Sequence, residues 1–339
     1  MSCKQLCVIY GLFLGFIAQA QTLKGRVLDA QTKEPIETAT VYFDNTTLGT
    51  TTNAKGEFSI EYNDAVQSIL VVSFLGFEKQ MIANYRTLSF INIELKEQTD
   101  SLDEVIINTN DGLTRKQKLQ QFRKEFLGTS TWAKSCKILN ENDLILRYHK
   151  PTKTITATSK NPVIVQNSKL QYEIAYDIID FEIIYNYVDE RNNVFNNKSV
   201  IYLGTSYYKP LLDRDKSRTQ KNRLKAYNGS VQHFMRALYR EQFEAFDYQI
   251  FFKGFIVNPW DYFKISKHEN PNLKEVVIEE QVTILYNKKA QSSLLATDTV
   301  FVVDQYGNYA PINKVLFVGD MGSQRIGDSL PFDYEPVFE

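Results

Sequence analysis

The sequence predicts a mainly β protein, with an N-terminal antiparallel β-sandwich followed by a second β-rich (α+β) domain with one or two helices. Its 339 residues are 43% hydrophobic and 23% charged, which is typical of an ordered, core-forming chain of about two domains. Short runs rich in Val, Ile, Phe, Tyr and Thr recur between turn-forming residues, whereas helical spacing of apolar residues occurs in only two places.

Residues 1–20 have the pattern of a secretory signal peptide. Lys4 precedes an apolar run at 8–18, and Ala18 and Ala20 stand in A-x-A spacing. The run is shorter than the ~20 residues that a membrane span needs, so we expect no transmembrane helix after cleavage. We therefore expect an exported protein, located in the periplasm or associated with the outer membrane.

Residues 22–97 have the pattern of a small sandwich. Phe58, Ile60 and Tyr62 alternate with polar residues, so one face of that strand should be buried. Residues 53–56 form a turn in which Gly56 is free to adopt positive φ. The expected strands are 23–29, 39–43, 57–62, 68–74, 77–82 and 90–95.

Four sequence blocks in this region resemble one known family. They are 24–29 (KGRVLD), 35–41 (PIETATV), 49–60 (GTTTNAKGEFSI) and 74–77 (FLGF). They resemble the carboxypeptidase-regulatory-like domain, which has a transthyretin-like β-sandwich and often opens the mature chain of surface proteins in Bacteroidetes-type bacteria. The resemblance implies a fold and an envelope setting. It does not imply an activity, because in zinc carboxypeptidases the corresponding domain follows the catalytic one and is not itself catalytic.

Residues 101–107 (SLDEVII) resemble the segment that joins this domain to the plug of TonB-dependent outer-membrane receptors. A barrel of that receptor type uses roughly 220 residues for its strands alone. Almost nothing of the remaining chain would be left for loops and plug, so a full transporter does not fit.

Residues 98–129 are expected to form a linker and a helix. Thr114 is a suitable N-cap, Leu119, Phe122 and Phe126 recur at helical spacing, and Gly128 can end the helix.

Residues 130–339 are expected to form a β-rich domain with a second helix at about 230–244, capped by Ser230. The run at 171–187 fits either one bent strand or two. The other expected strands are 143–148, 154–159, 200–203, 248–252, 276–286 and 299–303.

This second half also resembles an uncharacterised group of exported bacterial proteins that carry the same regulatory-like domain in front. The resemblance implies no reaction. It rests on the blocks 126–129 (FLGT), 136–140 (CKILN), 227–230 (YNGS), 233–234 (HF), 236–238 (RAL) and 330–334 (LPFDY).

No catalytic, metal-binding or cofactor-binding motif stands out. His149, His233 and His268 lack the spacing that a zinc peptidase needs, and the chain has neither a G-x-S-x-G elbow nor a P-loop. The near-balance of 39 basic and 40 acidic residues gives no reason to expect nucleic acid. We therefore expect no catalytic residues, no metal and no cofactor.

Cys136 is the one thiol outside the predicted leader, so the exported chain would have no internal disulfide. Its neighbours Lys134 and Lys137 would lower the thiol pKa if they lay close to it. The favoured interpretation is a small core residue on a strand.

Six residues are candidates for ligand binding. Arg218 and Arg223 belong to the basic run 213–225, which is either an anion site at the start of the next helix or a solvated loop. A second group, His233, Arg236 and Arg240, shares one helical face. That face is either a buried polar centre or, as we favour, a solvent-exposed or structural one.

Trp260 is the sixth candidate. It lies in an aromatic-rich stretch at 254–263, in which Pro259 should interrupt a strand and leave the indole in irregular backbone as an exposed platform.

The function predicted from these patterns is an exported envelope protein with a non-catalytic regulatory-like domain that binds or scaffolds a protein or glycan partner. Peripheral association with the outer membrane remains open. The alternative is an unrecognised envelope hydrolase with its site in the second domain. A third hypothesis makes the second half a small outer-membrane barrel.

Overall fold

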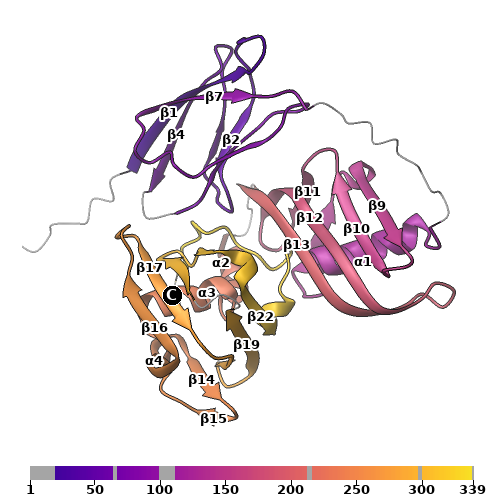
Figure 1. Cartoon of the computed structure of the whole chain (residues 1–339), viewed down its shortest axis with the longest axis vertical. Helices are drawn as coiled ribbons and strands as arrows, with labels where there is room; N and C mark the ends of the chain where they lie inside the picture. Colours follow the sequence, from indigo (N-terminus) through magenta and orange to yellow (C-terminus); the bar gives the residue numbers. More distant parts are fainter. Residues whose placement is uncertain (1–19, 64–66, 99–110, 212–215, 297–299, 338–339) are drawn as a thin grey trace, which may run out of the picture.

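The computed structural model describes residues 20–63, 67–98, 111–211, 216–296 and 300–337 (Figure 1). Apart from Ala20, the predicted leader lies outside these residues, and so does the receptor-like segment 101–107. The described chain forms an N-terminal sandwich, a central sheet unit and a C-terminal unit, coloured indigo, magenta and orange to yellow in Figure 1.

The N-terminal sandwich is confirmed. One sheet has the order β4-β1-β7 and the other β3-β2-β5-β6. Its pairs are antiparallel except β1 with β7, which run parallel. The strands are β1 (Ala20–Asp29), β2 (Thr40–Phe43), β3 (Gly49–Thr51), β4 (Glu57–Asn63), β5 (Leu70–Ser73), β6 (Gln80–Ile82) and β7 (Phe90–Leu95).

Local features of the sandwich follow from the sequence. Phe58, Ile60 and Tyr62 are buried while the residues between them are exposed, as the alternation predicts. The turn before β4 is also confirmed. Gly56 has φ +73°, and its amide donates to the carbonyl of Asn53 at 2.8 Å.

The central unit is a six-stranded sheet with helix α1 (Arg115–Leu127) packed against it (Figure 1). As predicted, Thr114 caps α1 and Gly128 ends it. The stretch beginning near 171 is one long strand with bulges, β12. The strands are β8 (Cys136–Ile138), β9 (Leu144–His149), β10 (Thr154–Ser159), β11 (Val163–Asn167), β12 (Tyr172–Asp189) and β13 (Val194–Pro210).

The C-terminal unit has its own apolar core between helix α3 (Val231–Arg240) and two sheets with the orders β15-β14-β18-β19-β22 and β16-β17-β20-β21. The strands are β14 (Tyr248–Phe252), β15 (Phe255–Ile256), β16 (Phe263–Lys267), β17 (Leu273–Ile278), β18 (Val282–Tyr286), β19 (Ala290–Ala296), β20 (Val300–Asp304), β21 (Tyr309–Ala310) and β22 (Val315–Gly319).

Two sequence interpretations are wrong in detail. The described part of the basic run is no loop, because Lys216–Tyr227 form helix α2. Its sequence lacks an apolar stripe, but its long charged side chains are good helix formers. Trp260 does not lie in irregular backbone, because Pro259–Tyr262 form a short helix, α4, capped by Asn258.

The predicted second helix is shorter than expected. α3 begins after the Ser230 cap, as predicted, but it ends at Arg240 because Glu241 adopts the left-handed conformation. The mainly β fold class is confirmed. Among the described residues, no helix has the length and apolar character needed to cross a membrane.

Candidate functional site

Residues 325–334, which we call the C-terminal strap, connect the parts of the molecule. At its start the strap binds the end of α1. The amide of Gly327 donates to the carbonyl of Leu127 at 3.0 Å, and Arg325 Nε donates to the carbonyl of Glu125 at 2.9 Å. Asn167 of β11 donates through Nδ2 to the carbonyl of Gly327 at 3.0 Å. These bonds attach the strap to the central unit.

At its other end the strap binds the N-terminal sandwich. The amide of Phe332 donates to the carbonyl of Asn45 at 2.7 Å, and the amide of Thr47 donates to Asp333 Oδ1 at 2.9 Å. The same loop of the sandwich adds to β13, because the amide of Asn45 donates to the carbonyl of Ser206 at 2.8 Å. The sandwich is therefore docked on both the strap and the central sheet.

Arg236 of α3 binds the strap from the C-terminal unit. Its side chain is 1% exposed, and Nη2 donates to the carbonyls of Phe332 at 2.9 Å and Tyr334 at 2.8 Å. Nε donates to the carbonyl of Tyr306 at 2.9 Å. A buried guanidinium is costly unless its donors are satisfied. Here backbone carbonyls accept from Nε and Nη2, and Nη1 lies 3.9 Å from Glu335 Oε2.

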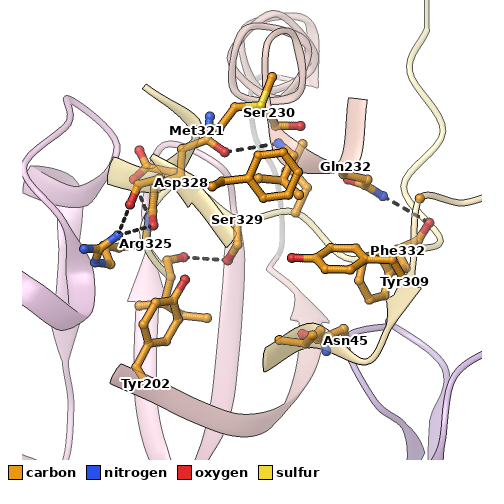
Figure 2. A pocket seen from close by; sticks show the side chains of 18 of the residues that line it. Asn45, Tyr202, Ser230, Gln232, Tyr309, Met321, Arg325, Asp328, Ser329 and Phe332 are labelled. Atoms are coloured by element: carbon orange, nitrogen blue, oxygen red, sulfur yellow. Dashed lines mark hydrogen bonds between the residues drawn. The ribbon is translucent and has the colours of Figure 1, made fainter. Parts of the chain in front are cut away.

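A cavity of about 410 Å³ lies beside the strap, where the sandwich, the central sheet and the C-terminal unit meet. Ligand pockets commonly have volumes of this order and combine apolar walls with a few polar groups. Figure 2 shows Tyr202 and Tyr309 approaching this space from different sides, with Ser329 between them. The apolar wall includes Val200, Leu203, Ile312, Val315, Phe317, Met321 and Leu330.

Two phenols on the cavity wall have no hydrogen-bond partner among the described residues. Burial raises the pKa of Tyr202 and of Tyr309, so both remain neutral at physiological pH. Among the described residues, neither hydroxyl has a hydrogen-bond partner. By contrast, Tyr208 pairs with Ser329 through their hydroxyl oxygens, which are 2.7 Å apart. The hydroxyls of Tyr202 and Tyr309 can therefore donate to or accept from a ligand.

Asp328 supplies the one carboxylate among the described residues that line the cavity. Burial raises its pKa, while hydrogen bonds from the Ser130 side chain and the Arg325 backbone act in the opposite direction. The Arg325 amide lies 3.1 Å from Asp328 Oδ2, and the Arg325 guanidinium lies 5.5 Å from the Tyr202 ring centre. Charge is thus confined to the strap side of the cavity.

The histidine and arginine stripe on α3, for which the sequence favours a solvent-exposed or structural face, is exposed only at its end and otherwise contacts protein groups. His233 and Arg236 are buried, and Arg240 alone is exposed. His233 Nδ1 accepts from the Gly229 amide at 3.1 Å and lies 2.9 Å from the Tyr248 hydroxyl. Burial, followed by the charges of Arg236 and Arg240, lowers the pKa of His233 to about 4. Two members of the stripe are therefore buried for different reasons: the strap covers Arg236, whereas the rings of Tyr227, Phe246, Tyr248 and Tyr286 surround His233.

The other candidates contact protein groups. Arg223 Nε donates to the carbonyl of Leu170 at 2.8 Å, and its guanidinium lies 4.0 Å from the Tyr172 ring centre, which joins α2 to the central sheet. Arg218 is exposed on α2. Trp260 is partly buried and stacks on Phe243, with ring centroids 5.2 Å apart.

None of the six predicted binding residues lines the cavity. Sequence reasoning missed Tyr202, Tyr309 and Asp328, because phenols on strands look like core residues and the strap lacks a periodic pattern. One sequence signal did point to this region. The block 330–334 (LPFDY), which resembles the group of exported proteins, belongs to the strap. Its Phe332 and Asp333 bind the sandwich loop.

Cys136 lies at the start of β8. Burial and, to a lesser degree, the charge of Asp328 raise its thiol pKa to about 12, opposite to the lowering that the flanking lysines would cause. Its thiol lies 3.4 Å from the Trp132 carbonyl. Within the described ranges, no group of three or more His, Cys, Asp or Glu side chains is placed to hold a metal ion.

Comparison with known proteins assigns the N-terminal region to a known domain family. Residues 23–107 match the family model of the CarboxypepD_reg-like domain, so the chain carries a domain of that family. The chain is also 38% identical over 104 residues to the TonB-dependent receptor SusC of Bacteroides thetaiotaomicron, a member of a Bacteroidetes envelope family. That match covers 30% of this chain and 10% of the receptor.

These two similarities point to an envelope protein of Bacteroidetes type. The chain spans about a tenth of the receptor it matches, so the receptor's activity as a whole protein does not transfer to it.

Similarity to solved structures is weak. A 9R-lipoxygenase from Cyanothece PCC8801 matches with 10% identity and a TM-score of 0.19, over 65% of this chain and 48% of that one. A protein of unknown function from Bacteroides fragilis NCTC 9343 matches with 12% identity and a TM-score of 0.19, over 88% and 97% of the two chains. At such scores neither similarity bears on the fold or function of this chain.

Proposed function

We propose that this chain is an exported, non-catalytic binding protein of the cell envelope, in which the CarboxypepD_reg-like domain completes a ligand-binding cavity. The observation that carries the proposal is the cavity beside the strap, to which the sandwich contributes Asn45, the central sheet Tyr202 and the C-terminal unit Tyr309. Removing any one of these parts would open the cavity.

The chemistry of the cavity favours binding over catalysis. Two of its polar groups are neutral phenols without a partner, and Cys136, the one thiol among the described residues, does not line the cavity and has a raised pKa. Such a site suits an apolar or aromatic group that carries one or two hydrogen-bonding atoms. A side chain of a protein partner or the non-sugar end of a glycan conjugate has this character, and either fits an envelope setting with peripheral association at the outer membrane.

Cell fractionation combined with in vivo crosslinking and mass spectrometry tests the proposal. A photoreactive amino acid at Ile312, on the cavity wall and partly exposed, should capture an envelope component. The double variant Tyr202→Phe/Tyr309→Phe should capture less of it, whereas the exposed Lys116→Ala variant should capture as much as the unmodified protein.

Two results contradict the proposal. One is a cytoplasmic location of the chain. The other is turnover of peptidoglycan or peptide libraries by the purified protein, which would support the hydrolase alternative instead.

A further inference from the structure

A second hollow lies next to the cavity and has a different character. It measures about 520 Å³ and shares Asp328, Gln324 and Ala226 with the cavity wall. Its two sides come from different parts of the chain: Trp132 precedes β8 in the central unit, and Tyr286 ends β18 in the C-terminal unit. We call this hollow the polar cleft.

The polar cleft contains exposed side chains that are not paired with other described protein groups. In the part of the chain that the structure describes, no hydrogen bond or ion pair engages the side chains of Lys225, Asn228, Asn287, Lys289 or Asp320. All five border the cleft. Elsewhere on the surface some charged side chains are paired, such as Lys150 with Glu190 at 2.9 Å and Lys274 with Glu241 at 2.6 Å.

The charges of the cleft balance. Lys225 and Lys289 oppose Asp320 and Asp328, while the amides of Asn228 and Asn287 supply both donors and acceptors without charge. A site for an anion or a cation would have an excess of one sign. Donors and acceptors of both kinds without net charge suit a neutral ligand that carries many hydroxyl groups.

Two aromatic side chains contribute apolar contact area to the same cleft. Tyr286 packs on Tyr248, with ring centroids 5.0 Å apart, and on His233 at 5.5 Å, so neighbouring rings hold its orientation. Burial raises the Tyr286 pKa, which keeps its hydroxyl neutral. Trp132 is partly buried against the core of the central unit. Aromatic rings of this kind pack against the C–H faces of pyranose rings.

We propose that the polar cleft binds a neutral oligosaccharide, with Trp132 and Tyr286 packing against sugar rings and Asn228, Lys289 and Asp320 hydrogen-bonding to hydroxyl groups. This inference rests on the proposed function as a binding protein, and it adds a second ligand class at a site distinct from the cavity.

The test uses the mature full-length protein with Trp260→Phe, which leaves Trp132 as the sole indole. The probes are neutral gluco- and manno-oligosaccharides of four to six units and, for comparison, an oligogalacturonate of equal length. We expect at least one neutral probe to change Trp132 fluorescence saturably and to bind more tightly than the oligogalacturonate.

Substitutions test whether the oligosaccharide binds in the polar cleft. Lys289→Ala, Asp320→Ala and Asn228→Ala should each weaken the affinity about 3- to 10-fold, as expected for the loss of one hydrogen bond. Lys288→Ala is the matched control, because Lys288 is exposed beside Lys289 but does not line the cleft. It should leave the affinity unchanged.

Three results would overturn the inference: no neutral probe alters the fluorescence, the oligogalacturonate binds more tightly, or Lys288→Ala weakens binding as much as Lys289→Ala. Crosslinking at Ile312 that depends on Tyr202 and Tyr309, together with failure of every neutral probe, would refute the polar-cleft site and leave the proposed function standing.

Discussion

The individual units and the junction between them are held together by different interactions. Apolar packing dominates inside each unit, whereas hydrogen bonds to the backbone are prominent at the junction. In the central unit, Phe122 and Phe126 of α1 stack at 4.8 Å and pack against Phe181 of the sheet. At the junction, Arg236 and the strap connect the units through hydrogen bonds to backbone carbonyls, and Ile326 and Leu330 of the strap add apolar contact with the central core. Each core can hold its own unit together, but the cavity depends on the junction.

The largest effect should come from a core truncation. Phe122→Ala removes a fully buried ring from the contact between α1 and the sheet, and we expect it to lower the free energy of unfolding by about 4 kcal/mol. Urea denaturation followed by circular dichroism measures this change. Lys116→Ala, on the exposed side of the same helix, should stay within about 0.5 kcal/mol of the unmodified protein. Equal losses for both variants would mean that α1 does not pack as described.

Arg236→Met should have the next largest effect. It removes the donors for three backbone carbonyls while keeping much of the side-chain volume, and we expect a loss of about 3 kcal/mol. Arg240→Ala, one turn further along α3 and exposed, should cost less than about 1 kcal/mol. A small loss for Arg236→Met would show that the strap is held by other contacts.

The docking of the sandwich should also depend on pH. Asp304 accepts from the amide of Gln67, and Asp44 accepts from the amide of Ser206; burial raises the pKa of both carboxyls to about 6. Because the pKa of each group is higher in the folded protein than in the unfolded chain, protonation favours folding. The contribution of the protonated carboxyls to the free energy of unfolding is complete below about pH 4 and is lost as the pH rises through 6.

We therefore expect the free energy of unfolding to decrease by about 2–3 kcal/mol per group between pH 4 and 6. Asp304→Asn should flatten this slope, and denaturation curves at closely spaced pH values would measure it. A slope that is unchanged in the variant would place the pKa of Asp304 near its ordinary value.

Stability should change least when a cavity hydroxyl is removed. Tyr309→Phe deletes a hydroxyl that has no partner among the described residues, so the free energy of unfolding should shift by less than about 0.5 kcal/mol. The same substitution, combined with Tyr202→Phe, should reduce capture at the cavity. A large loss of stability would instead reveal a structural role for the Tyr309 hydroxyl.

Sequence patterns predicted the cores well. Alternation identified the buried face of β4, and apolar spacing with a capping residue located α1 to within a residue. Both patterns are local and arise from burial against a single core. Helix α2 was missed because its buried residues are few and not all are apolar, namely Thr219, Ala226 and Tyr227.

The junction could not be predicted in the same way. The sequence left open whether Arg236 is buried, because nothing in its neighbourhood in the sequence shows that a segment nearly a hundred residues later covers it. Asp304 is buried for a similar reason, since its partner Gln67 lies 237 residues away. Hydrogen bonds to backbone carbonyls and amides require no particular residue type at the partner position, so they leave little trace in the sequence.

Hydrogen–deuterium exchange of the unmodified protein and of Arg236→Met tests most directly whether the junction holds the units together. In the unmodified protein, the amides of Asn45, Tyr208 and Phe332 should be protected, because each donates across the junction. In Arg236→Met, the protection of backbone amides should fall at 44–47 and in the strap, whereas the amides of β12 should stay protected. Exposed junction amides in the unmodified protein, or loss of protection in β12 together with the strap, would contradict this view of the molecule.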